Sequence, residues 1–292
     1  MKILVTAAQG QVGWELRRTL ATLGEVVAVD RHAMDLSDPD SVRKCIREIQ
    51  PGLIVNAAAY TAVDKAEAEP DLAMMVNGTA PGIMAEEAKR LGAAIVHYST
   101  DYVFDGSKAT PYAEDDATNP INVYGRSKLA GEEAIQAVGA PHLILRTSWV
   151  YGARGKNFLL TILRLARERD ELKIVDDQFG APTWSRTIAE TTAQMLAQRR
   201  SAAALAEVSG VYHLTARGCT SWHGFTQAIL AHSPLFVSGA SKPLLLPIST
   251  SEYPLPAKRP MNSVIGNAKL ASVFGLAQTD WEDALKLCLE AP

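Results

Sequence analysis

Short apolar segments alternate with segments of helical periodicity through the first half of the chain, and this alternation restricts the possible folds more than any other feature. The apolar segments have the length of buried strands and span residues 2–5, 26–29, 53–55, 94–98 and 142–146. Parallel strands joined by helical crossovers need this order of elements. The sequence therefore predicts an α/β fold in which helices cover both faces of a parallel sheet.

The loop after the first strand has the character of a nucleotide-binding turn. Gly10 and Gly13 lie just before a helix, while Ala7 stands where a first glycine is usual and is expected to limit how closely the backbone approaches a phosphate. Asp30 ends the second strand, where an acidic side chain can bind ribose hydroxyls. Glycine loops are often only tight turns, but this loop together with Asp30 favours a doubly wound, Rossmann-like dinucleotide-binding domain.

Two further strand ends carry residues suited to a ligand. The third strand leads into Asn56–Tyr60, whose alanines would let the backbone lie against a ligand, unless they serve only close helix packing. The fourth leads into Ser99–Tyr102, which offers hydroxyls and a phenol. Open α/β sheets bind ligands at this carboxyl edge, so both segments are candidate site residues.

Tyr124 and Lys128 are four residues apart in a segment expected to be helical, which places them on one face. A neighbouring ammonium favours the phenolate, so we expect the tyrosine pKa to fall from its reference of about 10 towards neutrality. A phenol tuned in this way can act as a general acid. A solvated helix face could show the same spacing, and the surrounding α/β pattern is what favours catalysis.

The regular alternation of predicted strands and helices ends near Gly152, which suggests two unequal domains. Residues 1–151 are expected to form the NAD(P)-binding domain. Residues 152–292 are expected to form mainly a smaller α/β substrate-binding cap, with some segments returning to the sheet. Within them we expect helices at 157–169 and up to about 199, strands at 172–175 and 211–214, and proline-rich connections.

Composition excludes several classes of protein. The formal net charge is -3 and basic residues form no run longer than a few, which argues against a nucleic-acid or membrane-surface binder. Three widely separated cysteines argue for a reducing compartment, and no apolar run suits a signal peptide or a membrane span. We therefore expect a cytoplasmic protein. The six histidines lack metal-ligand spacing, so no metal site is expected.

Several longer motifs carry a family resemblance. The segments 9–13, 56–64, 99–106, 122–128 and 146–152 resemble the extended short-chain dehydrogenases/reductases. Within that superfamily, Asp-Asp-Gln-Phe-Gly-Ala-Pro-Thr at 176–183 and Lys-Arg-Pro-Met-Asn-Ser at 258–263 are similar to the dTDP-4-dehydrorhamnose reductases. The resemblance implies reduction of the 4-keto group of dTDP-4-dehydro-L-rhamnose to dTDP-L-rhamnose, a sugar donor for cell-surface polysaccharide.

The resemblance also implies roles for individual residues. Its catalytic residues fall on Thr100, Tyr124 and Lys128, all of which are present. The implied substrate-binding residues are Thr100, Tyr102, Trp149, Asn157, Gln178 and Arg259. The implied cofactor-binding residues are Gly10, Gln11, Val12, Asp30, Arg31, Asp35, Leu36, Ala57, Ala58, Ala59, Tyr124 and Lys128. Other roles stay open for three of these: Trp149 as a core aromatic, Asn157 as a helix N-cap and Gln178 as a loop hydrogen-bonding residue.

The cofactor preference is expected to be mixed. Asp30 should accept hydrogen bonds from an adenosine ribose and repel a 2′-phosphate, which favours NADH. Arg31 follows Asp30 directly, and its guanidinium can donate two charge-assisted hydrogen bonds to a phosphate, which favours NADPH. We therefore expect both NADPH and NADH to be used.

Assembly is expected to differ from that of some relatives. Some family members dimerise around a metal such as magnesium held by glutamates, one of them in the helix after the Ala-Pro-Thr motif. In this chain Arg186 stands at that position, and a cation cannot replace a hard-metal oxygen ligand. We therefore expect a monomer without a bound metal.

Two other functions are compatible with the resemblance. One is a catalytically silent regulatory protein, like the regulatory subunit of methionine adenosyltransferase, but the intact Thr100, Tyr124 and Lys128 favour an enzyme. The other is a sugar-nucleotide epimerase or dehydratase. A dehydratase would be expected to carry a second acid after Asp101, where this chain has Tyr102.

Overall fold

Six parallel strands form the central sheet in the computed structural model of the protein, which describes residues 1–290. The order across the sheet is β10-β5-β4-β3-β1-β2, and every neighbouring pair is parallel. The strands are β1 (Lys2–Val5), β2 (Glu25–Ala28), β3 (Leu53–Asn56), β4 (Ala94–Thr100), β5 (His142–Thr147) and β10 (Gly210–His213). The chain reverses its direction of travel across the sheet between β1 and β3, which opens a crevice at their carboxyl ends.

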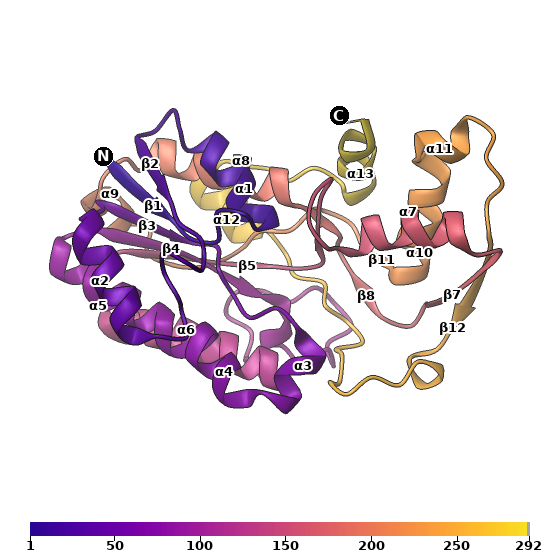
Figure 1. Ribbon diagram of the computed structural model, residues 1–292, viewed down its shortest axis with the longest axis horizontal. Helices are drawn as coiled ribbons and strands as arrows, with labels where there is room; N and C mark the ends of the chain where they lie inside the picture. Colours follow the sequence, from indigo (N-terminus) through magenta and orange to yellow (C-terminus); the bar gives the residue numbers. More distant parts are fainter. Residues whose placement is uncertain (291–292) are drawn as a thin grey trace.

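Helices cover both faces of this sheet because the strand side chains alternate between two cores (Figure 1). Ile3 and Val5 point into one core and Leu4 into the other. The first core contains residues of α1 (Gln11–Thr19), α8 (Ser185–Gln198), α9 (Ala202–Ala206) and α12 (Ala268–Phe274). The second contains residues of α2 (Pro39–Ile49), α5 (Ala80–Leu91) and α6 (Val123–Val138). The predicted doubly wound parallel sheet is confirmed.

One strand at the sheet's carboxyl edge differs from the sequence-based prediction. The fourth strand continues to Thr100, so Ser99 and Thr100 belong to the strand and not to the loop after it. The helix that leads into this strand starts as α4 (Pro70–Met74), passes through a π-helical turn at Met75–Thr79 and continues as α5. The wider turn brings the amide of Asn77 against the backbone of Tyr60 and the hydroxyl of Ser127. A short helix that the sequence did not predict, α3 (Val63–Ala68), precedes it.

The smaller α/β unit lies beyond one end of the sheet, where Figure 1 shows α7, α10, α11 and β12 grouped together. Its helices are α7 (Phe158–Glu168), α10 (Trp222–His232), α11 (Pro234–Val237) and α13 (Trp281–Glu290). Its strands form three pairs: β7 (Glu171–Val175) with β12 (Leu244–Ile248), β8 (Phe179–Gly180) with β11 (Thr220–Ser221), and β6 (Val150–Tyr151) with β9 (Thr183–Trp184). Its core is built around Tyr151, Phe225 and Ile229.

Parts of the later sequence return to the main sheet. The strand expected at 211–214 is β10, which pairs with β5 at the sheet edge, and the helix expected to end near 199 is α8, which packs against α1. By pairing with β5, β10 satisfies backbone groups of β5 that would otherwise be exposed at the edge of the sheet. Within residues 1–290, the helices are too short or too polar to cross a bilayer.

Candidate active site

The glycine loop between β1 and α1 is shaped to hold an anion. Gly10 caps α1 without a side-chain hydrogen bond, and the first turn of the helix carries no acidic residue. Its N–H groups and the positive end of the helix dipole can therefore face a phosphate. A Cβ on Gly13 would lie 2.1 Å from the carbonyl oxygen of Ala7, so this position requires glycine. The loop thus fits the pyrophosphate of a dinucleotide.

Ala7 adopts a φ of 52°, in the left-handed region that favours glycine. This conformation costs a residue with a Cβ roughly 1–2 kcal/mol. The loop therefore keeps the backbone shape of a glycine turn although alanine occupies the position. Ala7 also lines the neighbouring cavity, so its methyl group forms part of the wall.

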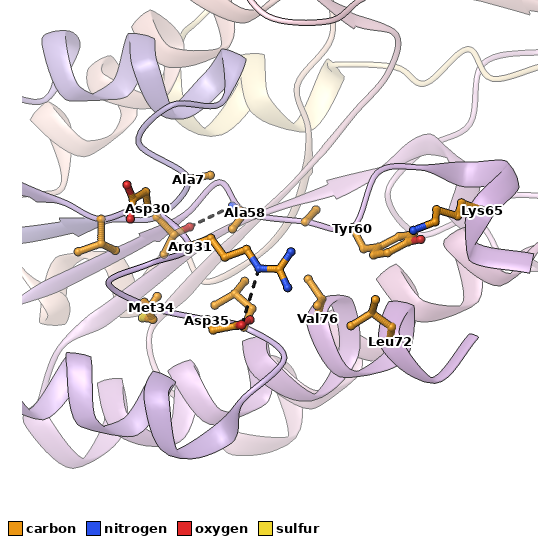
Figure 2. A pocket seen from close by; sticks show the side chains of 14 residues that line it. Ala7, Asp30, Arg31, Met34, Asp35, Ala58, Tyr60, Lys65, Leu72 and Val76 are labelled. Atoms are coloured by element: carbon orange, nitrogen blue, oxygen red, sulfur yellow. Dashed lines mark hydrogen bonds and ion pairs between the residues drawn. The ribbon is translucent and has the colours of Figure 1, made fainter. Parts of the chain in front are cut away.

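A cavity of about 330 Å³ opens beside this loop at the ends of β1, β2 and β3 (Figure 2). It brings together six of the predicted cofactor residues: Asp30, Arg31, Asp35, Leu36, Ala58 and Ala59. Gly10, Gln11, Val12, Ala57, Tyr124 and Lys128 do not line it. The wall also contains residues that were not assigned to the site from the sequence: Thr6, Val29, Met34, Lys65, Leu72 and Val76. Tyr60, from the candidate segment Asn56–Tyr60, lines it as well.

Arg31 and Asp30 play different parts at this cavity. Figure 2 shows Arg31 reaching across the space towards Asp35, whose Oδ2 lies 3.7 Å from the Arg31 Nε. The Arg31 side chain is 78% exposed. One carboxylate oxygen of Asp30 accepts hydrogen bonds from the backbone N–H groups of His32 and Ala33. Backbone hydrogen bonds thus orient the carboxylate of Asp30, whereas the guanidinium of Arg31 lies largely in solvent beside Asp35.

Close backbone packing sets the position of the Tyr124/Lys128 helix. Asn122 caps α6 by accepting from the N–H of Gly125 at 2.7 Å, and its amide donates to the carbonyl oxygen of Lys258 at 2.8 Å. A Cβ on Gly125 would lie 2.1 Å from the carbonyl oxygen of Tyr102. Gly125 therefore lets α6 rest directly on the segment after β4, which brings Tyr124 close to Thr100.

The expected lowering of the Tyr124 pKa is wrong for the ligand-free chain. Burial raises the pKa of Tyr124 to about 12; the nearby hydroxyl of Thr100 opposes this rise and the carboxylate of Asp101 reinforces it. Desolvation disfavours the phenolate more than its neighbours favour it. Tyr124 is consequently a protonated phenol at neutral pH, which is the form that a proton donor needs.

Two further ionisable groups beside Tyr124 are buried. Lys128 is 1% exposed, and burial lowers its pKa to about 8, opposed by Glu132. Its Nζ donates to the carbonyl oxygen of Tyr98 at 2.6 Å. Asp101 accepts from the hydroxyl of Thr100 at 2.9 Å, and burial raises the pKa of its carboxyl to about 6. Asp101 lies within the candidate segment Ser99–Tyr102, although no individual role was predicted for it.

The guanidinium of Arg259 is already paired with a carboxylate. Its Nη1 and Nη2 donate to the two carboxylate oxygens of Asp64 at 2.5 and 2.7 Å, and Nη1 also donates to the carbonyl oxygen of Ala257. Tyr102 lies close to the same guanidinium. Asp64 is an additional site residue that ends the motif at 56–64.

The remaining predicted substrate residues lie where the cap meets the sheet. Trp149, with a φ of 46°, stacks on Trp222 at 3.5 Å between ring centroids and an interplanar angle of 5°. The amide of Gln178 donates to the hydroxyl of Thr250 and accepts from the indole N–H of Trp222. Both Gln178 and Trp149 thus meet Trp222, which sequence reasoning missed because it lies far along the chain.

Asn157 joins the cap to the glycine loop. Its Oδ1 accepts from the N–H of Leu160 at 3.0 Å, which makes it the N-cap of α7. Its Nδ2 lies 2.9 Å from both Gln11 Oε1 and the carbonyl oxygen of Gly152. The helix-capping role that the sequence left open is therefore present.

Arg186, at the position that suggested the lack of a metal, pairs with Glu190 at 2.8 Å. In the part of the chain that the structure describes, no group of three or more His, Cys, Asp or Glu side chains is arranged to hold a metal ion.

Comparison with known proteins places this site in a family. A family model described as the RmlD substrate binding domain matches residues 1–292. The chain is 55% identical to a dTDP-4-dehydrorhamnose reductase of Burkholderia thailandensis, over 99% of this chain and 98% of that relative. A crystal structure of a dTDP-4-dehydrorhamnose reductase from Clostridium acetobutylicum has a TM-score of 0.91 and 37% identity, covering 99% of each chain.

A second solved structure shows a relative with a nucleotide. It is a dTDP-4-dehydrorhamnose reductase from Bacillus anthracis in complex with NADP, with a TM-score of 0.89, 33% identity and coverage of 98% of each chain. The resemblance carried by the sequence motifs is confirmed over the full length. The chain belongs to the dTDP-4-dehydrorhamnose reductase family.

Proposed function

We propose that this chain catalyses the NAD(P)H-dependent reduction of the 4-keto group of dTDP-4-dehydro-L-rhamnose to dTDP-L-rhamnose, a step in making sugar donors for cell-surface polysaccharide. The observation that carries the proposal is a protonated Tyr124 close to Thr100, with Lys128 one helical turn away, at the same sheet edge as the glycine loop that begins α1. The names of relatives up to 55% identical over nearly the whole chain support the same reaction.

Tyr124, Thr100 and Lys128 would each have a separate role in this reaction. The cofactor supplies a hydride when bound. Tyr124 donates a proton to the resulting alkoxide oxygen, and Thr100 hydrogen-bonds the same oxygen. Because burial keeps the phenol protonated, the proton is available at neutral pH. Lys128, buried beside Tyr124, would hold the hydroxyls of the nicotinamide ribose.

The cofactor and the substrate would approach this centre from two domains. In the domain at 1–151, Gly10, Gln11 and Val12 would bind the pyrophosphate at the start of α1. The adenosine would contact Asp30, Arg31, Asp35, Leu36, Ala57, Ala58 and Ala59. In the part at 152–292, together with Tyr102 from the first domain, the sugar nucleotide would contact Trp149 at the boundary and Asn157, Gln178 and Arg259. The free thiols of Cys45, Cys219 and Cys288 suit the reducing cytoplasm.

The proposal is tested by following NADPH absorbance with and without dTDP-4-dehydrorhamnose. Oxidation of NADPH that depends on the sugar nucleotide is expected. A silent regulatory protein would bind the cofactor without consuming it, and an epimerase or dehydratase would convert a sugar nucleotide without net loss of NADPH. Either result would overturn the proposal. The same assay with the uridine analogue of the substrate reports whether the thymine base is selected.

Replacing Arg259 with alanine is expected to raise KM by roughly 10- to 150-fold with little change in kcat. Loss of a charge-assisted hydrogen bond costs about 1.5 to 3 kcal/mol, and Arg259 is a largely buried cation close to Tyr102. Steady-state kinetics with varied sugar nucleotide measure the effect. The matched control is Lys258→Ala, because that neighbouring cation is exposed. A collapse of kcat at unchanged KM would give Arg259 a different role.

NADPH and NADH are expected to be used with kcat/KM values within roughly 100-fold of each other, because two unit charges at an exposed site interact by only about 1 to 4 kcal/mol. Arg31→Ala should lower efficiency with NADPH and leave NADH nearly unchanged. Kinetics with both cofactors check this, and Arg18→Ala serves as the control on a cation exposed elsewhere. An equal loss with both cofactors would mean that Arg31 is not near the 2′ position.

We also expect a monomer in solution, with no metal-dependent dimer, because Arg186 replaces a carboxylate and is paired with Glu190. Sedimentation velocity with and without EDTA tests this. A dimer that dissociates when EDTA is added would contradict the expectation.

A further inference from the structure

Asp64 links the short helix α3 to the segment 257–259, which follows β12 of the cap. Its Oδ1 accepts from the backbone N–H of Ala257 at 3.2 Å and from Nη1 of Arg259 at 2.5 Å. Its Oδ2 accepts from Nη2 of Arg259 at 2.7 Å, and Nη1 also donates to the carbonyl oxygen of Ala257 at 2.6 Å. One carboxylate thus holds both the backbone of this segment and the guanidinium that the segment carries.

The segment 257–259 has a second anchor at the start of α6. Nδ2 of Asn122 donates to the carbonyl oxygen of Lys258 at 2.8 Å, and the same side chain caps the helix that carries Tyr124. Tyr102, which lies close to the guanidinium, packs edge-on against Tyr124 with ring centroids 5.7 Å apart. The guanidinium held by Asp64 is therefore placed next to the proposed reacting centre.

Asp64 occupies only one edge of the guanidinium of Arg259. A guanidinium carries two N–H groups on each Nη and one on Nε, all in one plane. The carboxylate of Asp64 and the carbonyl oxygen of Ala257 accept both N–H groups of Nη1 and one of Nη2. The N–H of Nε and the second N–H of Nη2 are parallel and form another edge. That edge has the geometry to donate to two oxygens of a phosphate.

The pair also supplies the counter-charge that Arg259 needs before a ligand binds. The side chain of Arg259 is only 14% exposed, and a cation at this depth is costly without a nearby negative charge. The hydrogen bonds from Arg259 hold the pKa of the Asp64 carboxyl below its ordinary value. Asp64 is therefore a carboxylate at neutral pH and pairs with Arg259 as an ion.

We propose that Asp64 is a positioning residue for sugar-nucleotide binding, which holds the guanidinium of Arg259 so that its Nε/Nη2 edge is presented to the diphosphate. This inference rests on the proposed function, in which Arg259 contacts that ligand. A long side chain loses rotamer freedom when it binds a ligand, and a side chain that is fixed beforehand avoids part of this cost. Asp64 contacts Arg259 and not the substrate, so it acts on binding and not on the chemical step.

The opposite arrangement is a competition in which the diphosphate displaces Asp64 from Arg259. The carboxylate would then weaken binding, so the two arrangements predict opposite effects of removing it. The backbone N–H of Ala257 favours positioning. Ala257 is buried, and displacement of Asp64 would leave this N–H without the acceptor that it has in the structure.

The test is the affinity of the whole chain for dTDP, measured by isothermal titration calorimetry. Asp64→Asn keeps the size of the side chain but turns an NH₂ group towards a guanidinium donor, so the parallel pair is lost. The Kd for dTDP should rise roughly 10-fold, as expected for the loss of one charge-assisted hydrogen bond to the ligand. Thymidine, which has no phosphate, should bind wild type and variant alike. The matched control is Asp71→Asn, which changes an exposed carboxylate on α4.

A double-mutant cycle shows whether Asp64 acts through Arg259. In an Arg259→Ala background, Asp64→Asn should change the Kd for dTDP by no more than about twofold, because the guanidinium that it orients is gone. In steady-state kinetics, Asp64→Asn alone should raise KM for dTDP-4-dehydrorhamnose by a factor similar to the change in Kd. Its kcat and its KM for NADPH should stay close to those of the wild type, a separation that a folding defect would not produce.

Tighter binding of dTDP by Asp64→Asn would overturn the inference in favour of competition. An equal loss with thymidine, or a loss that persists in the Arg259→Ala background, would also overturn it, because Asp64 would then act elsewhere. The binding measurements need no catalysis. A chain that shows the expected dTDP effect but does not oxidise NADPH would contradict the proposed reaction alone. An active chain whose dTDP affinity is unchanged in Asp64→Asn would contradict this inference alone.

Discussion

Replacing Tyr124 with phenylalanine is expected to lower kcat by a factor of roughly 100 to 10,000, the usual contribution of a positioned general acid. The substitution removes one hydroxyl, which lies close to Thr100, and keeps the ring that packs edge-on against Tyr102. The affinity for the cofactor should change little, because the buried amine of Lys128 stays in place. The measurement is single-turnover and steady-state NADPH oxidation, with cofactor affinity determined separately by fluorescence.

The matched control for this variant is Tyr112→Phe. Tyr112 is also buried, and its hydroxyl donates to Asp105 at 2.9 Å, far from the proposed chemistry. Loss of this hydroxyl should affect stability and leave kcat close to that of the wild type. Turnover near the wild-type rate in Tyr124→Phe, or an equal loss in both variants, would remove Tyr124 from the role of proton donor.

The features that sequence reasoning predicted well are those encoded by neighbouring residues. The strands at 2–5, 94–98 and 142–146 appear where apolar runs sit between helical segments, because burial on both faces of a parallel sheet demands continuous apolar side chains. The proximity of Tyr124 and Lys128 follows from helix geometry alone. Thr100 was predicted to lie at the same site because the carboxyl ends of parallel strands share one edge of the sheet.

What sequence reasoning could not supply depends on partners that are distant in the chain. The guanidinium of Arg259 is already hydrogen-bonded to Asp64, which lies 195 residues away in the sequence. The stack of Trp149 on Trp222 likewise joins the sheet edge to the cap. No local pattern specifies either contact.

The protonation states of Tyr124 and Lys128 could not be predicted from the sequence either. The prediction for Tyr124 used only the spacing to Lys128, whereas its pKa is set chiefly by burial. Lys128 is itself buried and bonded to Tyr98 and His97. A pair of ionisable residues can be located by spacing, but the balance between desolvation and attraction needs the surrounding packing.

A buried ion pair gives the largest expected effect on stability. Glu132 and Arg146 are 2% and 4% exposed at the side chain, and Arg146 Nη2 donates to Glu132 Oε2 at 2.7 Å with Nε lying between both oxygens. The pair joins α6 to β5, and Ser99 on β4 donates to the same carboxylate. The carboxylate of Glu132 therefore links α6, which carries Tyr124 and Lys128, both to β5 and to the end of β4.

Glu132→Gln is therefore expected to lower the free energy of unfolding by about 3 to 5 kcal/mol, because it leaves the charge of Arg146 buried without a counter-charge. Urea denaturation followed by circular dichroism measures the loss. Glu133→Gln is the control, since this neighbouring glutamate is exposed and should change stability by at most about 0.5 kcal/mol. Glu132→Leu combined with Arg146→Met should recover much of the loss, because apolar residues of similar size replace both charges at once. If Glu132→Gln were as stable as Glu133→Gln, the ion pair would not be what fastens α6 to the sheet, and Ser99 and the apolar contacts of Ile135 would have to hold the helix in place.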